Sequence, residues 1–193
     1  WQRSPLALAE FLPFAAYART QERPLFAQQI YELVGSLAPG LRDAWYLQGD
    51  LLAAEGAYSL ALESFETGVA QGEYGRFGKS DFYFRIGEIY ALYWPQPDLE
   101  TAQTMYALAI SNNDFQEVNS LIRTHFLLGE AYRILDQPVE AIAEYEQRVP
   151  IHCRGGAAAA ASHHHKPARK GGVQRFGDDL PGKRPFCRGS HPV

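Results

Sequence analysis

The stretch from Ala44 to Ala70, AWYLQGDLLAAEGAYSLALESFETGVA, predicts two short helices joined by a tight turn. Gly56 stands between the two helices, because glycine readily adopts the positive φ that ends a helix. Small residues, Gly49 and Ala61, occur where the two helices must approach closely, and large apolar residues surround them. The stretch therefore predicts an antiparallel helix pair.

The same layout recurs along the chain. An alanine followed four residues later by an aromatic residue occurs as Ala27/Tyr31, Ala61/Phe65, Ala102/Tyr106 and Ala141/Tyr145. Successive alanines of this pattern are 34, 41 and 39 residues apart. An aromatic residue or histidine followed four residues later by glycine precedes three of them, as Trp45/Gly49, Tyr83/Gly87 and His125/Gly129. The recurrence predicts four helix pairs.

These copies resemble the tetratricopeptide repeat, a helix-turn-helix unit of 34 residues with the patterns W-x2-L-G-x2-Y, A-x3-F and a closing P. The last two copies match its first pattern as Tyr83-x2-Ile86-Gly87-x2-Tyr90 and His125-x2-Leu128-Gly129-x2-Tyr132. The resemblance covers about residues 6–149 and implies an all-α, right-handed superhelical α-solenoid of about four repeats. A longer link after the second copy and missing closing prolines mark the array as divergent.

Composition divides the chain at Pro150 into a helical repeat domain, residues 1–150, and a tail, residues 151–193. The domain holds ten basic and twenty acidic residues, whereas the tail holds eight basic and two acidic ones. The tail has many glycines and prolines and no amphipathic period, so its composition predicts disorder. Its abrupt change of composition leaves two origins open, a native basic tail and non-native sequence.

Helix ends can be expected from single residues. Eight helices are expected within residues 5–150, including one over 41–55 and one over 58–70. Pro13 should kink or divide the first helix, and the glycine-rich segment 72–78 suggests a flexible link. Three aspartates are expected to cap the helices that follow them, namely Asp81, Asp98 and Asp114.

Several partner classes are disfavoured by composition. No run approaches the roughly 20 apolar residues of a membrane span. The acidic domain disfavours a nucleic-acid backbone as the main partner. The sequence begins at Trp1 without methionine, which suggests a fragment, and the absence of cysteine from the repeats leaves the cellular compartment open.

Catalytic and metal-binding residues are scarce. The repeats contain one histidine, His125, and no cysteine, so no Ser-His-Asp or Cys-His set can be drawn. His125 occupies a position where the family has a packed tryptophan, which predicts a core histidine. Cys153 and Cys187 accompany several histidines in the tail, but without the closely paired spacing of a zinc site. The sequence predicts neither an enzyme nor a cofactor or metal site.

The resemblance also implies a binding groove. In this family the first helix of each pair lines a concave surface. By motif position, the residues expected to face it are Asp43, Tyr46 and Asp50 from repeat two, Asp81, Phe84 and Glu88 from repeat three, and Arg123, Phe126, Glu130 and Arg133 from repeat four. The three aromatic residues are expected to be exposed anchors among acidic charges. An ordinary solvated helix face is the alternative interpretation.

Two functions remain open at this point. The first is a non-catalytic protein–protein interaction scaffold, part of a longer bacterial-type repeat protein, that binds a basic and apolar peptide segment in the groove. The second is the regulatory or sensor portion of a larger enzyme or transcription regulator whose active domain is missing. The uncapped last helix also predicts a weak homo-oligomer through this end, or a tail segment that folds over it. Its expected apolar contacts are Leu135, Val139, Ile142 and Val149.

Overall fold

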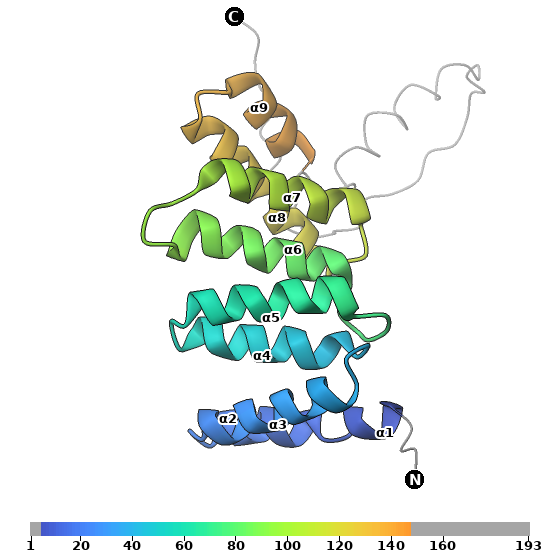
Figure 1. Ribbon diagram of the computed structural model, residues 1–193. Helices are drawn as coiled ribbons and strands as arrows, with labels where there is room; N and C mark the ends of the chain where they lie inside the picture. Colours follow the sequence, from blue (N-terminus) through green and yellow to red (C-terminus); the bar gives the residue numbers. More distant parts are fainter. Residues whose placement is uncertain (1–4, 148–193) are drawn as a thin grey trace, which may run out of the picture. The chain divides into compact units, whose positions relative to one another are not determined.

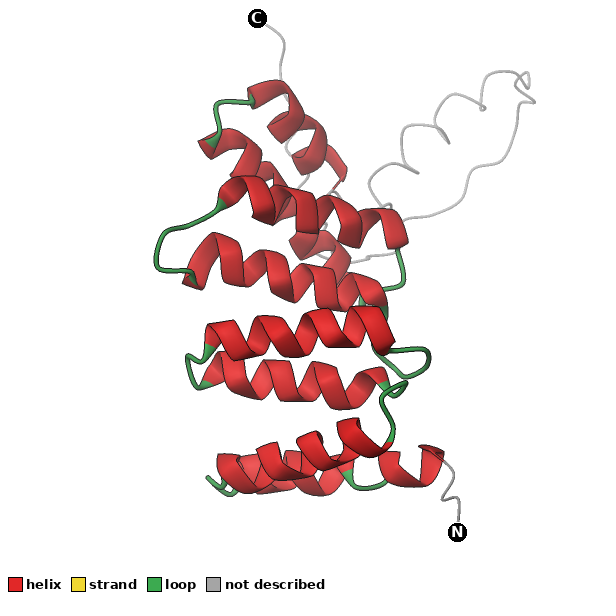
Figure 2. Cartoon of the chain, in the orientation of Figure 1, coloured by secondary structure: helices red, strands yellow, loops and turns green. Residues whose placement is uncertain are grey.

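Four antiparallel helix pairs follow one another along the chain and stack as a right-handed superhelical α-solenoid (Figure 1). The computed structural model describes residues 5–147, with side chains from Ala7 onward. Within this range there is no β-strand (Figure 2), and one isolated backbone bridge joins Leu41 to Tyr74. The predicted all-α solenoid is confirmed.

Each pair consists of an A helix followed by a B helix. The elements are α1 (Pro5–Ala9), α2 (Leu12–Thr20), α3 (Pro24–Leu37), α4 (Arg42–Ala54), α5 (Tyr58–Gln71), α6 (Lys79–Glu88), the π-helical turn η1 (Ile89–Tyr93), α7 (Leu99–Asn112), α8 (Val118–Ile134) and α9 (Pro138–Gln147). The A helices are α2, α4, α6 and α8, and the B helices are α3, α5, α7 and α9. Pro13 divides the first A helix as predicted, because α1 ends before it.

Contacts between glycine and an aromatic ring set the spacing within three of the pairs. A Cβ atom built on the A-helix glycine would lie far inside the contact distance of a B-helix ring carbon. The distances to Cε1 are 2.6 Å for Gly49 and Phe65, 2.6 Å for Gly87 and Tyr106, and 2.5 Å for Gly129 and Tyr145. Only glycine leaves room for the ring, so the predicted close approach is confirmed. The turn residue Gly56 has the expected positive φ, 78°.

Neighbouring pairs join through the B helix of one pair and the A helix of the next. A Cβ atom at Gly68 of α5 would overlap Cε1 of Phe82 in α6. At Gly35 of α3 a Cβ atom would lie 3.1 Å from Cη2 of Trp45 in α4. Apolar side chains fill the space between these contacts and form a core that continues from pair to pair. Each pair therefore buries its apolar face against its neighbours.

The glycine-rich link between α5 and α6, expected to be flexible, is fastened to the start of α4. Asp43 Oδ1 accepts hydrogen bonds from the backbone N–H groups of Arg76, at 2.7 Å, and Phe77, at 3.2 Å. Arg42 Nε donates to the carbonyl oxygen of Gly72 at 3.1 Å. Phe77 is buried and stacks on Tyr46, with ring centroids 3.8 Å apart. The extra residues of the link thus cover part of an A helix.

Only one of the three predicted caps lies where the sequence placed it. Asp98 accepts from the N–H of Thr101 and caps α7 as expected. Asp81 is instead the third residue of α6, where it accepts from the N–H of Gly78. Asp114 does not cap α8, which begins at Val118. Its carboxylate accepts from the first two N–H groups of α6, at 2.9 and 2.8 Å, and so fastens the connector between α7 and α8 to the start of α6.

Some expectations fall outside the described range or remain untested. The domain boundary at Pro150, the tail and Val149 lie beyond residue 147. In α9, Val139 and Ile142 are exposed, and self-association through them stays a prediction.

Within residues 5–147 no helix is both long enough and apolar enough to cross a membrane.

The close contact in the third pair generates a stability prediction. Gly87→Ala places a methyl group against the fully buried ring of Tyr106, so we expect the free energy of unfolding to fall by about 2 kcal/mol in urea denaturation. The same substitution in a Tyr106→Leu background should be much less destabilising, because the ring is gone. Equal losses in both backgrounds would show that the ring is not the obstacle.

The bonds of Asp114 generate a second prediction. Burial alone would raise the pKa of Asp114, but hydrogen bonds from Ser80 and Lys79 outweigh it and hold the pKa below its ordinary value. We expect Asp114→Ala to lower the free energy of unfolding at neutral pH by about 1 kcal/mol. This difference should be complete above the ordinary aspartate pKa and should shrink as the pH falls through the lowered value. Glu117→Ala, which removes an exposed carboxylate from the N-cap of α8, is the control and should have little effect.

Candidate partner-binding surfaces

Asp43 and Asp81, which share one repeat position in the predicted groove, both have structural partners. Asp43 holds the link between α5 and α6. Asp81 is 4% exposed and accepts hydrogen bonds from the N–H groups of Gly78, at 2.9 Å, and Gln116, at 3.0 Å. Burial raises the pKa of Asp81 above its ordinary value. Both carboxylates thus attach the A helix to the connector that follows the next B helix.

The predicted aromatic anchors are not exposed as a row. Phe84 is buried, with 6% of its surface exposed, and the guanidinium of Arg123 lies over its ring. Tyr46 is half-buried beneath Phe77, and burial raises the pKa of its hydroxyl group. Phe126 is half-buried and packs near Tyr145. The expectation of three exposed anchors is therefore wrong for Phe84, because its ring lies in a core cluster with Tyr106 of α7 and Leu128 of α8.

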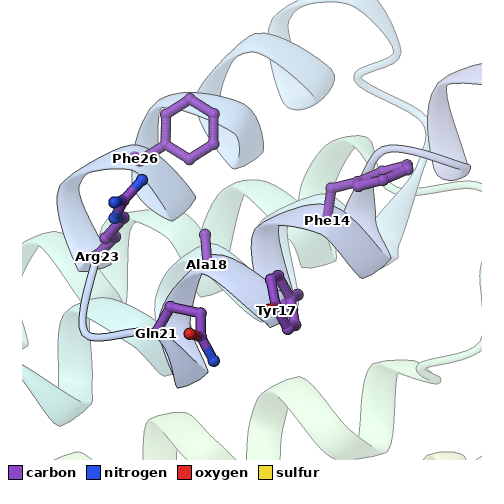
Figure 3. Close-up of a pocket in the computed structure, with 6 residues that line it drawn as sticks. All are labelled: Phe14, Tyr17, Ala18, Gln21, Arg23 and Phe26. Atoms are coloured by element: carbon purple, nitrogen blue, oxygen red, sulfur yellow. The ribbon is translucent and has the colours of Figure 1, made fainter.

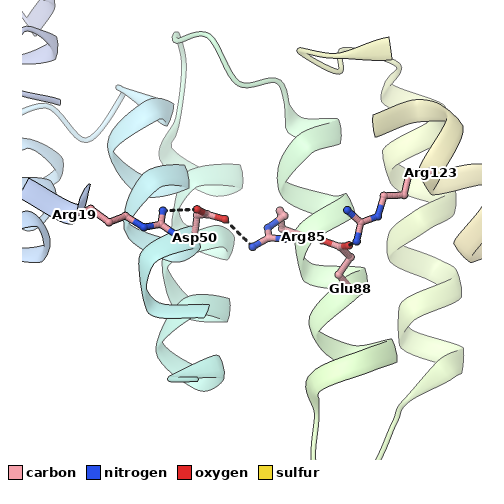
Figure 4. A network of polar contacts seen from close by, with 5 residues as sticks. All are labelled: Arg19, Asp50, Arg85, Glu88 and Arg123. Atoms are coloured by element: carbon pink, nitrogen blue, oxygen red, sulfur yellow. Dashed lines mark hydrogen bonds and ion pairs between the residues drawn. The ribbon is translucent and has the colours of Figure 1, made fainter. Parts of the chain in front are cut away.

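A chain of ion pairs joins the four A helices (Figure 4). Asp50 binds Arg19 of α2 and Arg85 of α6, both at 2.7 Å. Arg85 also binds Glu88 at 2.7 Å, and Glu88 binds Arg123 of α8 at 2.5 Å. We call these five residues the A-layer ladder. It contains three of the predicted groove residues, and it adds two that sequence analysis missed, Arg19 and Arg85.

The ladder is partly buried and carries a net positive charge. Glu88 is 1% exposed, whereas the side chain of Arg123 is 57% exposed. Burial alone would lower the pKa of Arg85, but the carboxylates of Asp50 and Glu88 raise it above its ordinary value. Three guanidinium groups face two carboxylates, so no carboxylate of the ladder is left without a cation. The one sequence signal for Arg85 was its position three residues before Glu88.

The remaining groove pair lies at the C-terminal end of α8. Glu130 accepts hydrogen bonds from Arg133, at 2.8 Å, and from the hydroxyl group of Tyr145. These hydrogen bonds, that of Arg133 first, hold the pKa of Glu130 below its ordinary value. All five carboxylates of the predicted groove are therefore engaged within the fold. The groove is less acidic than its sequence indicates.

Charge is sorted between the two layers of helices. Within their described bounds the four B helices contain no lysine or arginine. They contain seven glutamates: Glu32, Glu63, Glu66, Glu100, Glu140, Glu144 and Glu146. The A helices, in contrast, carry Arg19, Arg42, Arg85, Arg123 and Arg133 beside their acids. Within the described helices, lysine and arginine thus lie on the A layer, and the charged residues of the B layer are glutamates alone.

Two pockets occupy equivalent places in the B layer. The first seam pocket, about 340 Å³, lies between α3 and α5 above α4. The second seam pocket, about 300 Å³, lies between α5 and α7 above α6. Their floors use the same repeat positions, which are Trp45, Gln48 and Leu52 in the first and Tyr83, Ile86 and Tyr90 in the second. Glu32 and Glu66, also equivalent, line one pocket each.

The third seam, between α7 and α9 above α8, contains an internal contact between a histidine and a glutamate. His125 occupies the repeat position of Trp45, and Glu144 occupies that of Ser64. His125 Nδ1 lies 2.7 Å from Glu144 Oε2, and the histidine side chain is 14% exposed. His125 is therefore packed within the last repeat, as the sequence predicts.

A further pocket of about 400 Å³ lies at the N-terminal end of the solenoid (Figure 3). Phe14 and Tyr17 of α2 and Phe26 of α3 line it, and each is more than half exposed. Arg23, in the turn between these helices, completes the wall.

Comparison with solved structures finds proteins of the same architecture. A structure of MamA has a TM-score of 0.60 and 16% sequence identity, covering 78% of this chain and 81% of that chain. BtubC (BKLC) from P. vanneervenii has a TM-score of 0.61 and 16% identity, covering 91% of this chain and 73% of that one. Both are TPR-like helical proteins. The fold is TPR-like. A second MamA structure agrees, with a TM-score of 0.58, 15% identity and coverage of 84% and 79%. No family model and no curated protein matches this sequence.

The ladder makes a testable contribution to this TPR-like fold. Arg85→Met removes the guanidinium that joins Asp50 to Glu88 and leaves the buried Glu88 with one partner. We expect the free energy of unfolding, measured in urea, to fall by about 2 kcal/mol. Arg133→Met is the matched control, because Arg133 also pairs with a glutamate three residues away but is 59% exposed, and it should change stability little. Similar small effects from both variants would exclude a structural role for the ladder.

Proposed function

We propose that this chain is a non-catalytic protein-interaction scaffold that binds a segment carrying basic and apolar side chains. The charge sorting carries this proposal. The B helices, within their described bounds, carry glutamates and no lysine or arginine, and pockets with aromatic and aliphatic walls lie between those helices. Such a surface attracts a positively charged partner and offers it apolar contacts.

The non-catalytic part of the proposal rests on how the titratable groups are used. His125 pairs with Glu144 inside the last repeat, and Asp43 and Asp81 hold connectors. Asp50 and Glu88 hold the ladder. These groups thus serve the packing of the repeats, whereas general acid–base catalysis needs a titratable group placed against a substrate.

The groove of the A helices is the surface that the family resemblance favours for the partner. The exposed charged groups of the groove are Arg123 and Arg133, whereas its carboxylates already have partners within the fold. A basic segment is therefore better matched to the B layer, whereas the groove could contribute Phe126 as an apolar contact. The expected partner is still a basic and apolar segment, but its favoured binding surface is the B layer and not the A-helix groove.

Selection from random peptides tests the proposal directly. A displayed library of such peptides is selected on the immobilised full-length chain and sequenced. We expect enrichment of lysine, arginine and apolar residues, and we expect binding of the selected peptides to weaken as salt is raised. Selection of predominantly acidic peptides, or no enrichment, would contradict the proposal.

Two variants then locate the site. One truncates an apolar side chain of the groove, and the other removes two negative charges from the B layer. Loss of binding on Phe126→Ala alone would place the segment in the groove. Loss on the double variant Glu63→Gln and Glu66→Gln alone would place it on the B layer, which is the expected outcome. Both variants change partly or fully exposed positions, so circular dichroism should show that they fold like the wild type.

A further inference from the structure

Most side-chain hydrogen-bond donors around the first seam pocket already donate to an oxygen atom of the same chain. Its tryptophan, its two hydroxyl groups and one amide each donate a hydrogen bond to a neighbouring oxygen. These bonds run from Trp45 Nε1 to the carbonyl of Pro39 at 2.9 Å, from the Ser64 hydroxyl to the carbonyl of Leu60 at 3.0 Å, from the Thr67 hydroxyl to the carbonyl of Glu63 at 2.7 Å, and from Gln28 Nε2 to Glu32 Oε1 at 2.8 Å. With these four donors engaged, the carboxylates of Glu32 and Glu63 and the amide oxygen of Gln48 are acceptors that line the pocket.

One of these acceptors is buried and has no partner. Gln48, at the floor of the pocket, is 8% exposed, and its Oε1 atom accepts no hydrogen bond within the described residues. A buried polar group without a partner is uncommon in folded proteins and calls for an explanation. Rotation of the Gln48 amide toward a ligand that brings N–H donors into the pocket would supply the missing bond.

The charge of the pocket restricts that ligand to a cation. Glu32 and Glu63 line it from α3 and α5, and neither forms an ion pair with any residue in the described range. Trp45 offers an aromatic face of the kind that attracts ammonium and guanidinium groups. Leu52 and Leu60 offer apolar surface for the methylene stem of a basic side chain.

The third seam shows the same pairing made within the chain. There His125 takes the place of Trp45, and its ring nitrogen contacts the carboxylate of Glu144. A basic nitrogen thus already lies against a glutamate in an equivalent seam of this molecule. The first seam has the carboxylates but lacks the basic group.

We propose that the first seam pocket binds a lysine or arginine side chain of a protein partner, between the carboxylates of Glu32 and Glu63 and above Trp45 and Gln48. This inference rests on the proposed function and gives the basic group of the partner a place. Lysine brings three N–H donors and arginine five, which suits a pocket of acceptors. The second seam pocket keeps one glutamate and has Ile86 where the first has Gln48, so it would take an apolar side chain of the same segment.

Nuclear magnetic resonance on the full-length chain tests the pocket with single side chains. The probes are N-acetyl-arginine amide and N-acetyl-lysine amide, with N-acetyl-norleucine amide as the uncharged comparison. A single side chain supplies only millimolar affinity, so each probe is titrated to about 20 mM. The indole N–H signal of Trp45, assigned with Trp45→Phe, should shift in a saturable way with the two cationic probes only.

Matched charge variants separate the pocket from the general negative field. The pocket variant is Glu32→Gln with Glu63→Gln, and the control is Glu100→Gln with Glu140→Gln, which removes the same charge elsewhere on the B layer. We expect affinity to fall roughly tenfold or more in the pocket variant and to change little in the control. Absence of a saturable shift, equal binding of the norleucine probe, or equal losses in both variants would overturn the inference.

The outcomes for the pocket and for the proposed function can be told apart. A pocket that binds the cationic probes while peptide selection yields nothing would sustain the site and refute the scaffold proposal. Selected basic peptides that bind the pocket variant as tightly as the wild type would sustain the scaffold and refute the site.

Discussion

The contact between an A-helix glycine and a B-helix aromatic ring fixes the geometry on which the rest of this solenoid depends. In three pairs the ring occupies the space that a Cβ atom would need, so the two helix axes approach as closely as backbone and ring allow. This approach brings the A helices into one layer and the B helices into another. It also leaves each pair with an apolar face that only a neighbouring pair can cover.

Polar residues of the A helices are used mainly to connect repeats. Asp43 and Asp81 occupy the same repeat position and bind the backbone of the following connector, while Asp114, in the connector between α7 and α8, binds the start of α6. The A-layer ladder crosses all four repeats in the same layer. Because these carboxylates already have partners, a ligand would have to compete with the fold for them.

The B layer differs because its glutamates face no arginine or lysine of their own helices. A-helix side chains form the floor of each seam, and the residues at three floor positions decide how polar that floor is. Trp45 and Gln48 give the first seam a polar floor, Ile86 gives the second an apolar one, and His125 contacts a carboxylate in the third. A single repeat pattern thus produces three chemically distinct surfaces.

The sequence by itself determined the four helix pairs, the turn at Gly56, the division at Pro13 and the packed His125. These features follow from local periodicity and from residues whose steric limits act wherever they occur. Tertiary structure decided which groove residues are available. The burial of Phe84, the covering of Tyr46 by Phe77 and the pairing of Asp50 with Arg19 and Arg85 join residues from different repeats or from a connector. A repeat pattern places each side chain on a face of its own helix, but only the stacking of neighbours determines what that face meets.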